Sequence, residues 1–504
     1  MNLNPISTED MQVLELNAAS LGVTHSMLMH NAGREVARTI SQNEKIKGKI
    51  VTILCGLGGN GGDGMVAARY LQELGAQVTV LLIGSENDIS NKDTIENWNI
   101  LNNIEEIQRK ELKSEASIKS MKIIQESDIL LDAMMGFGLR SRLRQPMLSA
   151  VKTFNKSNAV KYAVDIPTGI DSDTGKVYGE AVKAKITIAL HAPKIGSIQC
   201  PDYTGEIKTV SIGIPDETDR ICGLGDLSLF NKPRSPNTKK GDYGRILVIG
   251  GSSLYSGAPT LTGLAALRTG ADLVSIAAPE SVASTIRTYS PNLMVSSLPT
   301  NDLRPDSFNA LSALIKKQDV IAVGPGLGTL AETKEVVRLL IDEIVKEDKY
   351  MVVDADGLKG IAGSGIRLNP EKCVLTPHLG EVRILLDTKQ KKKPSQKERI
   401  VLAMDAAKQY NSVVLLKGHI DIISQPDGLY KLNRTGVPAM SVGGTGDVLT
   451  GIVAALLAHN KGAFKAASAA AYISGRAGEI AFDRLGDHLM ATDCIDSIPQ
   501  AMKR

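Results

Sequence analysis

The sequence predicts an α/β protein with two domains. Its 504 residues exceed the size at which a single hydrophobic core usually stops growing. In both halves of the chain, short apolar runs that close on a glycine or a polar residue alternate with stretches of helical periodicity. Glycine is abundant, at 47 residues, as expected where turns pack helices closely on sheets. Together these features indicate sheets of mainly parallel strands covered by helices.

The composition limits the classes of function. Hydrophobic residues at 43% and charged residues at 22% are typical of a globular protein. A formal net charge of only +3 argues against a nucleic-acid binder, and no apolar run is long enough to cross a bilayer. The stretch MNLNPISTED lacks the regions of a signal peptide, and the five scattered cysteines include no CxxC pair. We therefore expect a cytoplasmic protein with a small substrate and no nucleic-acid or membrane partner.

The first half contains a βαβ unit around a glycine turn. The run KIVTILCG from Lys49 leads into GLGGNGGDG, then a helical segment, then a second strand, AQVTVLLIG. Two further strand-like runs end on acids, at Asp132 and Asp165. Ligands of open parallel sheets bind beyond the carboxyl ends of the strands, so we expect a site formed by Asn60, Asp63, Asp132 and Asp165. This half is predicted to be a Rossmann-like three-layer domain.

The glycine turn also matches the pattern of a dinucleotide-binding dehydrogenase. Gly56, Gly58 and Gly61 satisfy GxGxxG between a strand and a helix, and Glu86 could supply the ribose-binding acid. However, the same turn contains Asp63, and a carboxylate would repel a pyrophosphate. The dehydrogenase interpretation is therefore weaker than its pattern suggests.

Three polar residues of the first half form a candidate cation site. The amide, carboxylate and hydroxyl oxygens of Asn60, Asp132 and Thr168 are the ligands that hard cations prefer. The alternative for strand-end acids such as Asp132 and Asp165 is structural, because such acids often cap the turn that follows.

The second half repeats the alternation of strands and helices. We place the domain boundary between Pro215 and Tyr243, where prolines and polar residues gather. Strand-like runs follow, among them RILVIGGS, DLVSIAAP, DVIAVGPGLG, YMVVDADG, KCVLTPHLG and SVVLLKG. Their order is that of a mainly parallel sheet with helices on its faces. The basic insert from Asp387 to Arg399 is expected to be a solvated loop.

A second glycine turn, GGTGD, precedes the segment VLTGIVAALLAH. This segment is apolar on almost all sides and is predicted to be a buried helix that begins near Gly446. Glycines at a helix N-terminus let phosphate oxygens approach unpaired N–H groups, so the turn suits an anion. Asp447 would repel a phosphate unless it acts as a general base on the group that attacks the phosphate. The alternative is that Asp447 only caps the helix.

Several motifs, in order along the chain, resemble one enzyme family. The stretch from Lys239 to Pro279, GPGLG at Gly324, LTPHLGE at Leu375, LLKG at Leu415 and GGTGDVLTG resemble the ribokinase-like NAD(P)H-hydrate dehydratases. GLGGNGGDG, DAMMGFGLRSRLR and VDIPTGIDSDTG resemble the NAD(P)H-hydrate epimerases. The chain thus resembles the bifunctional NAD(P)H-hydrate repair enzymes over nearly its whole length. The resemblance implies an epimerase domain at residues 1–217, a linker at 218–238 and a ribokinase-like dehydratase domain at 239–504.

This resemblance implies a repair reaction on hydrated NADH and NADPH. In the family, a nucleotide phosphorylates the hydroxyl of the hydrated nicotinamide ring, and elimination of phosphate restores the reduced cofactor. The epimerase converts the R hydrate into the S hydrate that the dehydratase accepts. We expect ADP as co-substrate, AMP and phosphate as products, Mg²⁺ for the phosphates and a homo-oligomer. The sequence leaves open the choice between ADP and ATP and between the two hydrates.

The resemblance also implies the residues of the dehydratase site. Asp447 would deprotonate the hydroxyl, while Ala258, Gly326 and His378 would line the hydrate site. The implied nucleotide site consists of Lys417, Gly418, His419, Ile420, Asp421 and Gly446. Each has a structural alternative: His378 follows a strand and could be a core histidine, the lysine of LLKG could simply be exposed, and GPGLG could be only a tight turn.

For the epimerase site, the resemblance implies K⁺ bound by Asn60, Asp132 and Thr168. Asp165 would bind the substrate and transfer protons while the ring substituent inverts. The remaining substrate-binding residues would be Gly59, Asn60, Gly61, Gly62 and Asp63, together with Gly136, Phe137, Gly138, Leu139, Arg140, Ser141 and Arg142.

Three residues of this half depart from the family pattern. Gly59 stands where an asparagine is usual, Phe137 replaces the threonine of a GTG turn, and His30 replaces the acid of MENAG. Phe137 is expected to affect the epimerase most, because its ring removes a hydroxyl donor and narrows the pocket.

Two other functions fit parts of the pattern. Hydroxyethylthiazole kinase is similar in fold to the second half and shares a glycine-turn acid, so a small-molecule kinase is one alternative. Domains related to the first half serve as binding modules in RNA-decapping scaffolds and lipoprotein-associated proteins, so this half could be a non-catalytic nucleotide-binding module. The retention of Asn60, Asp132 and Asp165 argues against a module without catalysis.

Overall fold

The computed structural model describes residues 4–139, 141–231, 233–388 and 392–503. The chain divides into two compact units, Met1–Thr218 and Asp219–Arg504, which we call unit 1 and unit 2. Across the described ranges, no helix has both the length and the apolar character needed to span a membrane. All five cysteines are free thiols.

Unit 1 is built on a seven-stranded sheet in which all strands are parallel, in the order β3-β2-β1-β4-β5-β6-β7. The strands are β1 (Ile50–Cys55), β2 (Gln77–Leu82), β3 (Ile107–Glu111), β4 (Ile129–Ala133), β5 (Val160–Val164), β6 (Ile186–Leu190) and β7 (Glu206–Val210). The helices are α1 (Thr8–Ser20), α2 (His25–Asn43), α3 (Gly59–Glu73), α4 (Lys92–Leu101), α5 (Glu115–Lys119), α6 (Ile123–Glu126), α7 (Met147–Lys156), α8 (Ile195–Ile198) and α9 (Pro201–Thr204).

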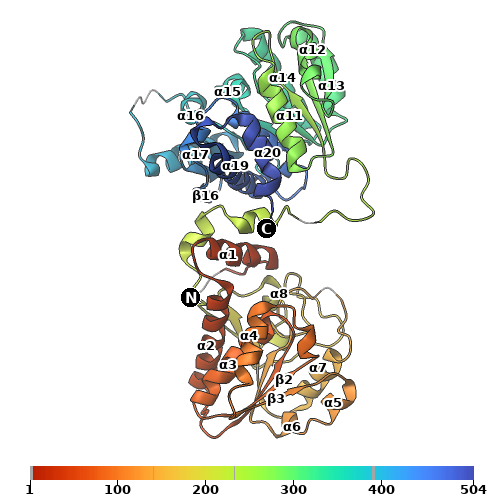
Figure 1. Ribbon diagram of the computed structural model, residues 1–504, viewed down its shortest axis with the longest axis vertical. Coiled ribbons are helices and arrows are strands. Elements are labelled where there is room, and N and C mark those ends of the chain that lie inside the picture. Colours follow the sequence, from red (N-terminus) through yellow and green to blue (C-terminus); the bar gives the residue numbers. More distant parts are fainter. Residues whose placement is uncertain (1–3, 140, 232, 389–391, 504) are drawn as a thin grey trace. The chain divides into compact units, whose positions relative to one another are not determined.

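The sheet of unit 1 has a hydrophobic core on each face. Successive residues of β1 point to opposite faces, so Ile53 packs in one core and Leu54 in the other. The first core includes Trp98 of α4, and the second includes Phe154 of α7. Figure 1 shows α2, α3 and α4 on one side of the sheet and α5 and α7 on the other. The prediction of a three-layer α/β domain is therefore confirmed.

The strand order of unit 1 determines where a ligand can bind. In the sheet, β2 and β3 lie on one side of β1, whereas β4, β5, β6 and β7 follow on its other side. The direction in which strands are added thus reverses between β1 and β4. The carboxyl ends of β1 and β4 therefore flank a topological switch point, where open parallel sheets bind ligands. Asp132 is the second-last residue of β4, Asp165 directly follows β5, and the first glycine turn follows β1. These positions place the predicted polar residues at one edge of the sheet.

Unit 2 is built on a nine-stranded sheet with the order β10-β9-β8-β11-β12-β13-β14-β15-β16. Only the pairs β14·β15 and β15·β16 are antiparallel, so the predicted mainly parallel sheet is confirmed. The strands are β8 (Arg245–Ile249), β9 (Leu273–Pro279), β10 (Met294–Leu298), β11 (Val320–Val323), β12 (Tyr350–Val353), β13 (Cys373–Leu375), β14 (Val413–Leu416), β15 (Asp421–Ser424) and β16 (Tyr430–Asn433).

The helices of unit 2 cover both faces of this sheet. They are α10 (Leu224–Ser228), α11 (Gly257–Thr269), α12 (Glu280–Tyr289), α13 (Phe308–Ile315), α14 (Ala331–Lys346), α15 (Ala355–Ile361), α16 (Leu379–Leu385), α17 (Gln396–Tyr410), α18 (Thr445–Leu457), α19 (Ala463–Leu485) and α20 (Ala491–Ala501). The strand order reverses between β8 and β11, which gives unit 2 a switch point of its own.

The helix after the second glycine turn is buried, as predicted. Every residue of α18 from Val448 to Leu457 is buried. At Gly451 the helix touches α11, because a Cβ on this residue would overlap the carbonyl oxygen of Thr262. The Thr262 hydroxyl donates a hydrogen bond to the backbone carbonyl of Asp447, at 3.1 Å. These contacts hold the first turn of α18, and with it Asp447, against α11.

The basic insert is a mostly exposed loop where the structure describes it before Gln396, as predicted, but its last four residues belong to a helix. Residues 389–391 lie outside the described residues, but α17 already begins at Gln396. Ser395 and Glu398 form a capping box at its N-terminus, a signal that the run of basic residues obscured. Arg399 is only 7% exposed, and its guanidinium donates a hydrogen bond to the carbonyl of Lys417, at 3.4 Å. The end of the insert is therefore part of the fold.

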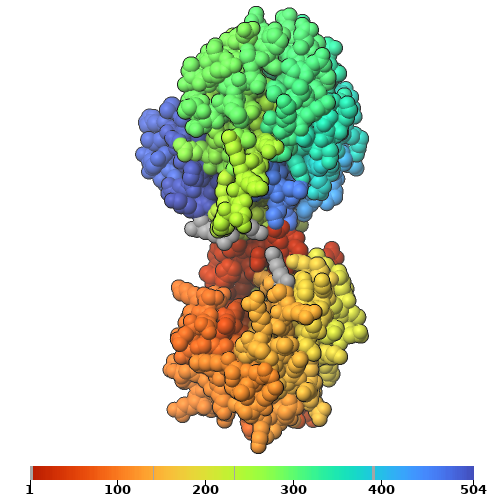
Figure 2. Space-filling model, turned by 90° about the vertical axis from the view of Figure 1, so that its right-hand side faces the viewer, coloured from red at the N-terminus to blue at the C-terminus, as the bar shows by residue number. Residues whose placement is uncertain are grey.

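The residues predicted as a linker pack largely on unit 2. Ile221 forms a β-bridge with Leu432 of β16, and the buried Asp226 of α10 accepts a hydrogen bond from Lys431, at 2.6 Å. Figure 2 shows the yellow-green segment of the chain lying on the surface of unit 2. The functional boundaries at residues 217 and 239 remain predictions.

We predict that Asp226→Asn destabilises unit 2, because the largely buried Lys431 ammonium would lose its counter-ion. Removing one partner of a buried ion pair typically costs roughly 3–5 kcal/mol. Amide hydrogen exchange is followed as a function of urea concentration in peptides that cover β14 to β16. In Asp226→Asn, the urea concentration at the midpoint of unfolding should be lower than in the unmodified protein. Glu217→Gln, at an exposed position, is the matched control and should not change that midpoint. Equal midpoints for both variants would contradict the prediction.

Candidate active sites

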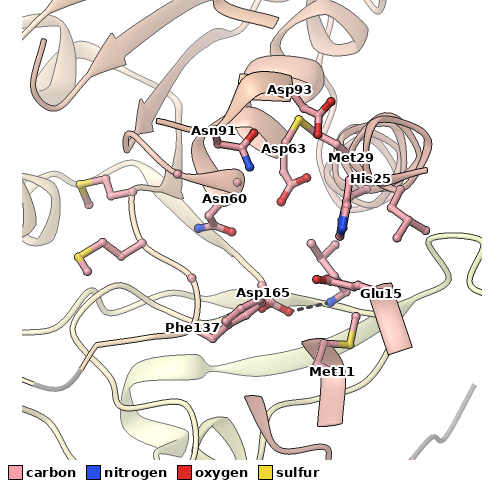
Figure 3. Close-up of a pocket in the computed structure, with 18 of the residues that line it drawn as sticks. Met11, Glu15, His25, Met29, Asn60, Asp63, Asn91, Asp93, Phe137 and Asp165 are labelled. Atoms are coloured by element: carbon pink, nitrogen blue, oxygen red, sulfur yellow. Dashed lines mark hydrogen bonds between the residues drawn. The ribbon is translucent and has the colours of Figure 1, made fainter. Parts of the chain in front are cut away.

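Unit 1 contains a pocket of about 600 Å³ at the carboxyl ends of its strands. Figure 3 shows Asn60, Asp63, Phe137 and Asp165 around this pocket, with Glu15 of α1 close to Asp165. The residues of the predicted epimerase site that line the pocket are Gly59, Asn60, Asp63, Gly136, Phe137 and Asp165. The fold thus brings together residues that lie far apart in the sequence.

The glycine turn after β1 depends on close packing. A Cβ on Gly56 would overlap the carbonyl oxygen of Met134, and a Cβ on Gly61 would overlap that of Gly56. Gly58 is the N-cap of α3, so the unpaired N–H groups of the first helical turn lie at the pocket. Gly61 and Gly62 are buried in the packing of α3, which gives these two predicted binding residues a structural role.

Asp165 forms a buried ion pair at the floor of the pocket. Its carboxylate accepts a hydrogen bond from the Lys194 ammonium at 2.5 Å and another from the backbone N–H of Leu190 at 3.2 Å. Lys194 is fully buried and also donates to the carbonyls of Leu190 and Ala192. Asp165 has φ +63°, a left-handed conformation that is strained for a residue with a side chain. Such strain is frequently found at functional sites.

Two other carboxylates of this pocket have no partner. Among the described residues, neither Glu15 nor Asp63 forms a side-chain hydrogen bond or ion pair. Burial raises the pKa of Glu15 to about 7, the ammonium of Lys194 opposes this rise, and the Asp165 carboxylate adds to it. Burial also raises the pKa of Asp63 well above its usual range, with a further contribution from the negative charge of Asp165. The pocket therefore holds two acids with raised pKa values beside the ion-paired Asp165.

Asp132 and Thr168 of the predicted cation site contact each other. Asp132 accepts hydrogen bonds from the hydroxyl and the backbone N–H of Thr168, both at 2.8 Å, and from the N–H of Met134 at 3.1 Å. These bonds tie the loop after β4 to the loop after β5, which is the capping role given as the alternative. Asn60 lies next to Gly136, and its buried amide nitrogen has no hydrogen-bond partner among the described residues. An orphaned buried amide indicates a position where a ligand group completes the hydrogen bonding.

The loop predicted to bind the cofactor phosphates is divided between two pockets. Gly136 and Phe137 line the first, whereas Leu139, Ser141 and Arg142 line a second pocket of about 510 Å³. Leu57, Ile83, Met135 and Met147 line both pockets. Gly138 is exposed, and Arg140 lies outside the described residues.

The three departures from the family pattern have different structural settings. A Cβ on Gly59 would meet no atom within 4 Å, so the glycine leaves open space where the usual asparagine would stand. The Nδ1 atom of His30, a residue of α2, lies 3.4 Å from a guanidinium nitrogen of Arg69. Burial lowers the pKa of His30. Phe137 is half-buried and forms part of the wall of the pocket, whose volume is about 600 Å³.

Glu86, the acid that the dehydrogenase interpretation assigns to a ribose, is engaged elsewhere. Its carboxylate accepts a hydrogen bond from the indole N–H of Trp98 at 2.7 Å. Its backbone N–H donates to the Glu111 carboxylate, also at 2.7 Å. These contacts give Glu86 a structural role and remove support from the dehydrogenase interpretation.

In unit 2, Asp447 lies in the first turn of α18 but does not cap it. The N-cap is Gly444, at φ +95°, and no described residue forms a hydrogen bond or ion pair with the Asp447 carboxylate. Burial raises the pKa of Asp447 to about 7; the nearby Asp354 carboxylate adds to this rise, and the Lys417 ammonium opposes it. A carboxylate with this pKa can accept and release a proton near neutral pH.

Lys417 connects the strand ends around Asp447. Its ammonium forms an ion pair with Asp354 at 2.7 Å, and the other oxygen of Asp354 accepts a hydrogen bond from the Thr450 hydroxyl at 2.8 Å. Burial alone would lower the pKa of Lys417, but the carboxylates of Asp354, Glu381 and Asp447 raise it above its ordinary value. A Cβ on Gly446 would lie 3.3 Å from the Lys417 ammonium nitrogen. The glycine turn and the predicted nucleotide-binding lysine therefore adjoin.

The other predicted nucleotide residues form the turn between β14 and β15. The Gly418 N–H donates to the Asp421 carboxylate at 2.9 Å, and Asn433 donates to its other oxygen at 3.0 Å. A Cβ on Gly418 would overlap the guanidinium of Arg399, which places a further cation against this turn. His419 is exposed and Ile420 half-buried.

Of the three residues predicted to line the hydrate site, Gly326 follows β11, His378 follows β13 and Ala258 lies in α11. A Cβ on Gly326, at φ +69°, would lie 3.3 Å from the Cβ of Ala258, so these two residues adjoin. His378 is the N-cap of α16: its Nδ1 accepts hydrogen bonds from the N–H groups of Gly380 and Glu381, which leaves the proton on Nε2. The His378 side chain is 59% exposed, so it is not a core histidine.

Sequence reasoning missed five residues that the fold adds to the two sites, Glu15, Lys194, Asp354, Arg399 and Thr450. Asp354 directly follows β12, and it therefore carried the same signal as Asp165. Lys194 and Glu15 lie in segments without a glycine turn or a strand-end acid, so no local pattern distinguished them.

The geometry of both units agrees with the comparisons to known proteins. Residues 246–500 match the family described as NAD(P)H-hydrate dehydratase, and residues 25–196 match the family described as YjeF-related protein N-terminus. The chain is 40% identical to the bifunctional NAD(P)H-hydrate repair enzyme of Hyperthermus butylicus, over 99% of this chain and 92% of that protein. It is also 40% identical to the enzyme of the same name from Pyrobaculum aerophilum, over 100% and 99% of the two chains.

Among solved structures, the chain is similar to the ADP/ATP-dependent NAD(P)H-hydrate dehydratase from Bacillus subtilis that was co-crystallised with ATP and Mg²⁺. The identity is 28%, the match covers 55% of this chain and 95% of that one, and the TM-score is 0.46. The resemblance found in the sequence motifs is confirmed by the two family matches and by the full-length relatives. The chain therefore belongs to the family of bifunctional NAD(P)H-hydrate repair enzymes.

Proposed function

We propose that unit 2 dehydrates the S hydrates of NADH and NADPH at the expense of ADP, and that unit 1 interconverts the R and S hydrates. The observation that carries the proposal is the setting of Asp447. It is an acid without a partner among the residues that the structure describes, with a pKa of about 7, next to a lysine and a glycine turn at a helix N-terminus. Family membership over the whole chain supports assigning one activity to each unit.

In the proposed dehydratase reaction, Asp447 accepts the proton of the ring hydroxyl while that oxygen attacks the terminal phosphate of the nucleotide. Gly446 lets the phosphate approach the N–H groups of α18, and Lys417 supplies positive charge beside it. Ala258, Gly326 and His378 would hold the hydrate, and Gly418, His419, Ile420 and Asp421 the rest of the nucleotide. Elimination of the phosphate from the ring then restores the reduced cofactor.

Mg²⁺, when bound, would neutralise charge on the nucleotide phosphates. The carboxylates nearest to Asp447 are already engaged: Asp354 binds Lys417 and Thr450, and Asp356 binds Lys359 and the N–H of Gly328. The described residues contain no cluster of three acids, histidines or cysteines that could hold a metal. These observations favour a metal ion that enters with the nucleotide.

For unit 1, we propose that Asp165 acts as the base during inversion and that Asn60, Asp132 and Thr168 hold K⁺. Their amide, carboxylate and hydroxyl oxygens fit a hard cation. The unpartnered amide nitrogen of Asn60 is a donor, so it would contact an acceptor group of the substrate. Gly59, Asp63, Gly136 and Phe137 would contact the substrate in the first pocket. Leu139, Ser141 and Arg142 would contact it in the second.

A small-molecule kinase with a non-catalytic first unit is the second candidate function. Its expected product is a stable phosphate ester, whereas the proposed reaction releases phosphate and recovers the absorbance of the dihydronicotinamide. The strained, ion-paired Asp165 favours catalysis in unit 1, because a binding module has no need for it.

We predict that Asp447→Asn abolishes dehydration, since the amide cannot accept the hydroxyl proton. The rate with the S hydrate of NADH, ADP and Mg²⁺ should fall roughly 10²–10⁴-fold, measured as recovery of dihydronicotinamide absorbance. Asp405→Asn, at an exposed position of α17, is the matched control. A variant that retains the full rate would refute the role of Asp447, and a stable phosphorylated product from the unmodified protein would favour the kinase.

The dehydration rate should depend on pH through Asp447. Because the base must be deprotonated, kcat/KM is expected to rise as the pH increases through about 7 and to level off above it. In Lys417→Met this rise should move to higher pH, because the ammonium that lowers the pKa of Asp447 is removed. The measurement is the pH profile of both proteins with the S hydrate. A shift to lower pH would contradict the electrostatic argument.

Asp165→Asn should separate the two activities. With an equilibrated mixture of R and S hydrates and ADP, the unmodified protein should recover all of the reduced cofactor. In the variant, recovery should stop at the S fraction apart from spontaneous epimerisation, while the initial rate on S is unchanged. Asp202→Asn, exposed on α9, is the control. Complete and fast recovery by Asp165→Asn would remove Asp165 from the epimerase mechanism.

A further inference from the structure

The pocket of unit 1 contains more ionisable groups than the proposed role of Asp165 uses. Besides Asp165 and its partner Lys194, the acids Glu15, Asp63 and Asp93 and the imidazole of His25 line it. Of these, Glu15 comes from α1, which precedes the residues that match the epimerase family at 25–196.

The N-terminal segment holds Glu15 in a defined place relative to Lys194. Ile6 forms a parallel β-bridge with Lys194, through hydrogen bonds to Pro193 and Ile195 at 2.9 and 3.2 Å. Thr8, the first residue of α1, donates its N–H to the Asp173 carboxylate at 2.7 Å. The chain on either side of Lys194 and the start of α1 are thus joined, and Glu15 lies two turns along that helix.

The environment of Glu15 suits an acid that gives up a proton. The residue is half-buried, lies among the apolar side chains of Met11, Leu28 and Met29 that line the pocket, and has no hydrogen-bond or ion-pair partner among the described residues. Figure 3 shows its carboxyl group next to the contact of Asp165 with the lysine ammonium. An unpaired carboxyl group in such a place favours the protonated form, and burial raises the pKa of Glu15 to about 7.

Inversion at the carbon that carries the ring hydroxyl needs one proton donor and one acceptor. When the carbon–oxygen bond breaks, the oxygen keeps the electron pair and must gain a proton to leave as water, while the ring nitrogen shares its lone pair with the carbon. When water adds to the other side of the ring, the carbon–oxygen bond re-forms, the nitrogen recovers its lone pair, and the water loses a proton. Atoms and electrons balance, and one proton has moved from the donor to the acceptor.

We infer that Glu15 is the catalytic acid of unit 1, which protonates the leaving hydroxyl, and that Asp165 accepts the proton from the incoming water. The inference rests on the proposed epimerase function and adds the second proton-transfer group to it. Exchange with solvent returns both groups to their starting state, since Glu15 is not fully buried.

Asp63 is less suited to this role than Glu15. Burial and the charges of Asp165 and Glu15 raise the pKa of Asp63 well above its usual range, which favours the protonated form over release of the proton. A carboxyl group that stays protonated can instead donate a hydrogen bond to the substrate.

The test compares Glu15→Gln and Glu15→Asp with the exposed control Glu73→Gln in the full chain. Purified R hydrate of NADH is incubated without a nucleotide, so that unit 2 cannot consume the S product, and the conversion is followed by chromatography. The same proteins are then assayed with S hydrate and ADP, which reports on unit 2 within the same molecule.

For Glu15→Gln, kcat of epimerisation should fall at least about 10²-fold with KM changed less than about threefold, and dehydration of S should be unchanged. Because the acid must be protonated, the rate of the unmodified protein should decrease as the pH rises through about 7. This decrease should be absent in Glu15→Gln and present, at a lower overall rate, in Glu15→Asp.

Two results would overturn the inference while leaving the epimerase function intact: an unchanged kcat in Glu15→Gln, or a slower variant that keeps the decrease near pH 7. If Glu15→Gln lowers the thermal midpoint of unit 1, Glu15→Asp decides, and absence of the pH-dependent decrease in that variant would refute the assignment. Failure of the unmodified protein to accelerate epimerisation would reject the proposed function of unit 1 together with the role of Glu15.

Discussion

Both units depend on the constraint that parallel strands deliver their carboxyl ends to one edge of a sheet. At that edge each unit adds a buried ion pair between an aspartate that directly follows a strand and a lysine from a later segment. The pairs are Asp165 with Lys194 in unit 1 and Asp354 with Lys417 in unit 2. The first pair connects the segments after the neighbouring strands β5 and β6, and the second connects the ends of β12 and β14 across β13. In unit 2 the glycine turn adjoins the pair, because Gly446 lies next to Lys417.

Each ion pair also lies close to an acid that has no hydrogen-bond or ion-pair partner in the described part of the chain, Glu15 in unit 1 and Asp447 in unit 2. Burial raises the pKa of both acids to about 7; in each case the aspartate of the ion pair adds to the rise and the lysine opposes it. The two sites thus share one electrostatic arrangement, an ion-paired carboxylate next to an acid that exchanges its proton near neutral pH. Reactions that move protons at a ring hydroxyl need groups of this kind.

The features that could be predicted from the sequence are those with a local cause. Strand runs, glycine turns and acids after strands identified both sheets and placed Asn60, Asp165 and Asp447, because each depends on a few adjacent residues. Glu15 and Lys194 could not be predicted in this way. Their significance arises only when Ile6 pairs beside Lys194, a contact between segments almost the whole length of unit 1 apart.

The two buried ion pairs give the fold no stability that apolar residues could not also provide. Taking both charges out of water often costs as much as their attraction returns, and well-packed apolar residues of similar volume stabilise a fold at least as well. Asp165 adds backbone strain at φ +63°, a conformation that costs about 1–3 kcal/mol. A non-catalytic nucleotide-binding module would need groups that contact phosphates, but neither this strain nor an unpaired acid beside it. Because unit 1 contains both in the pocket at the carboxyl ends of its strands, chemistry at the pocket explains its structure better than binding alone.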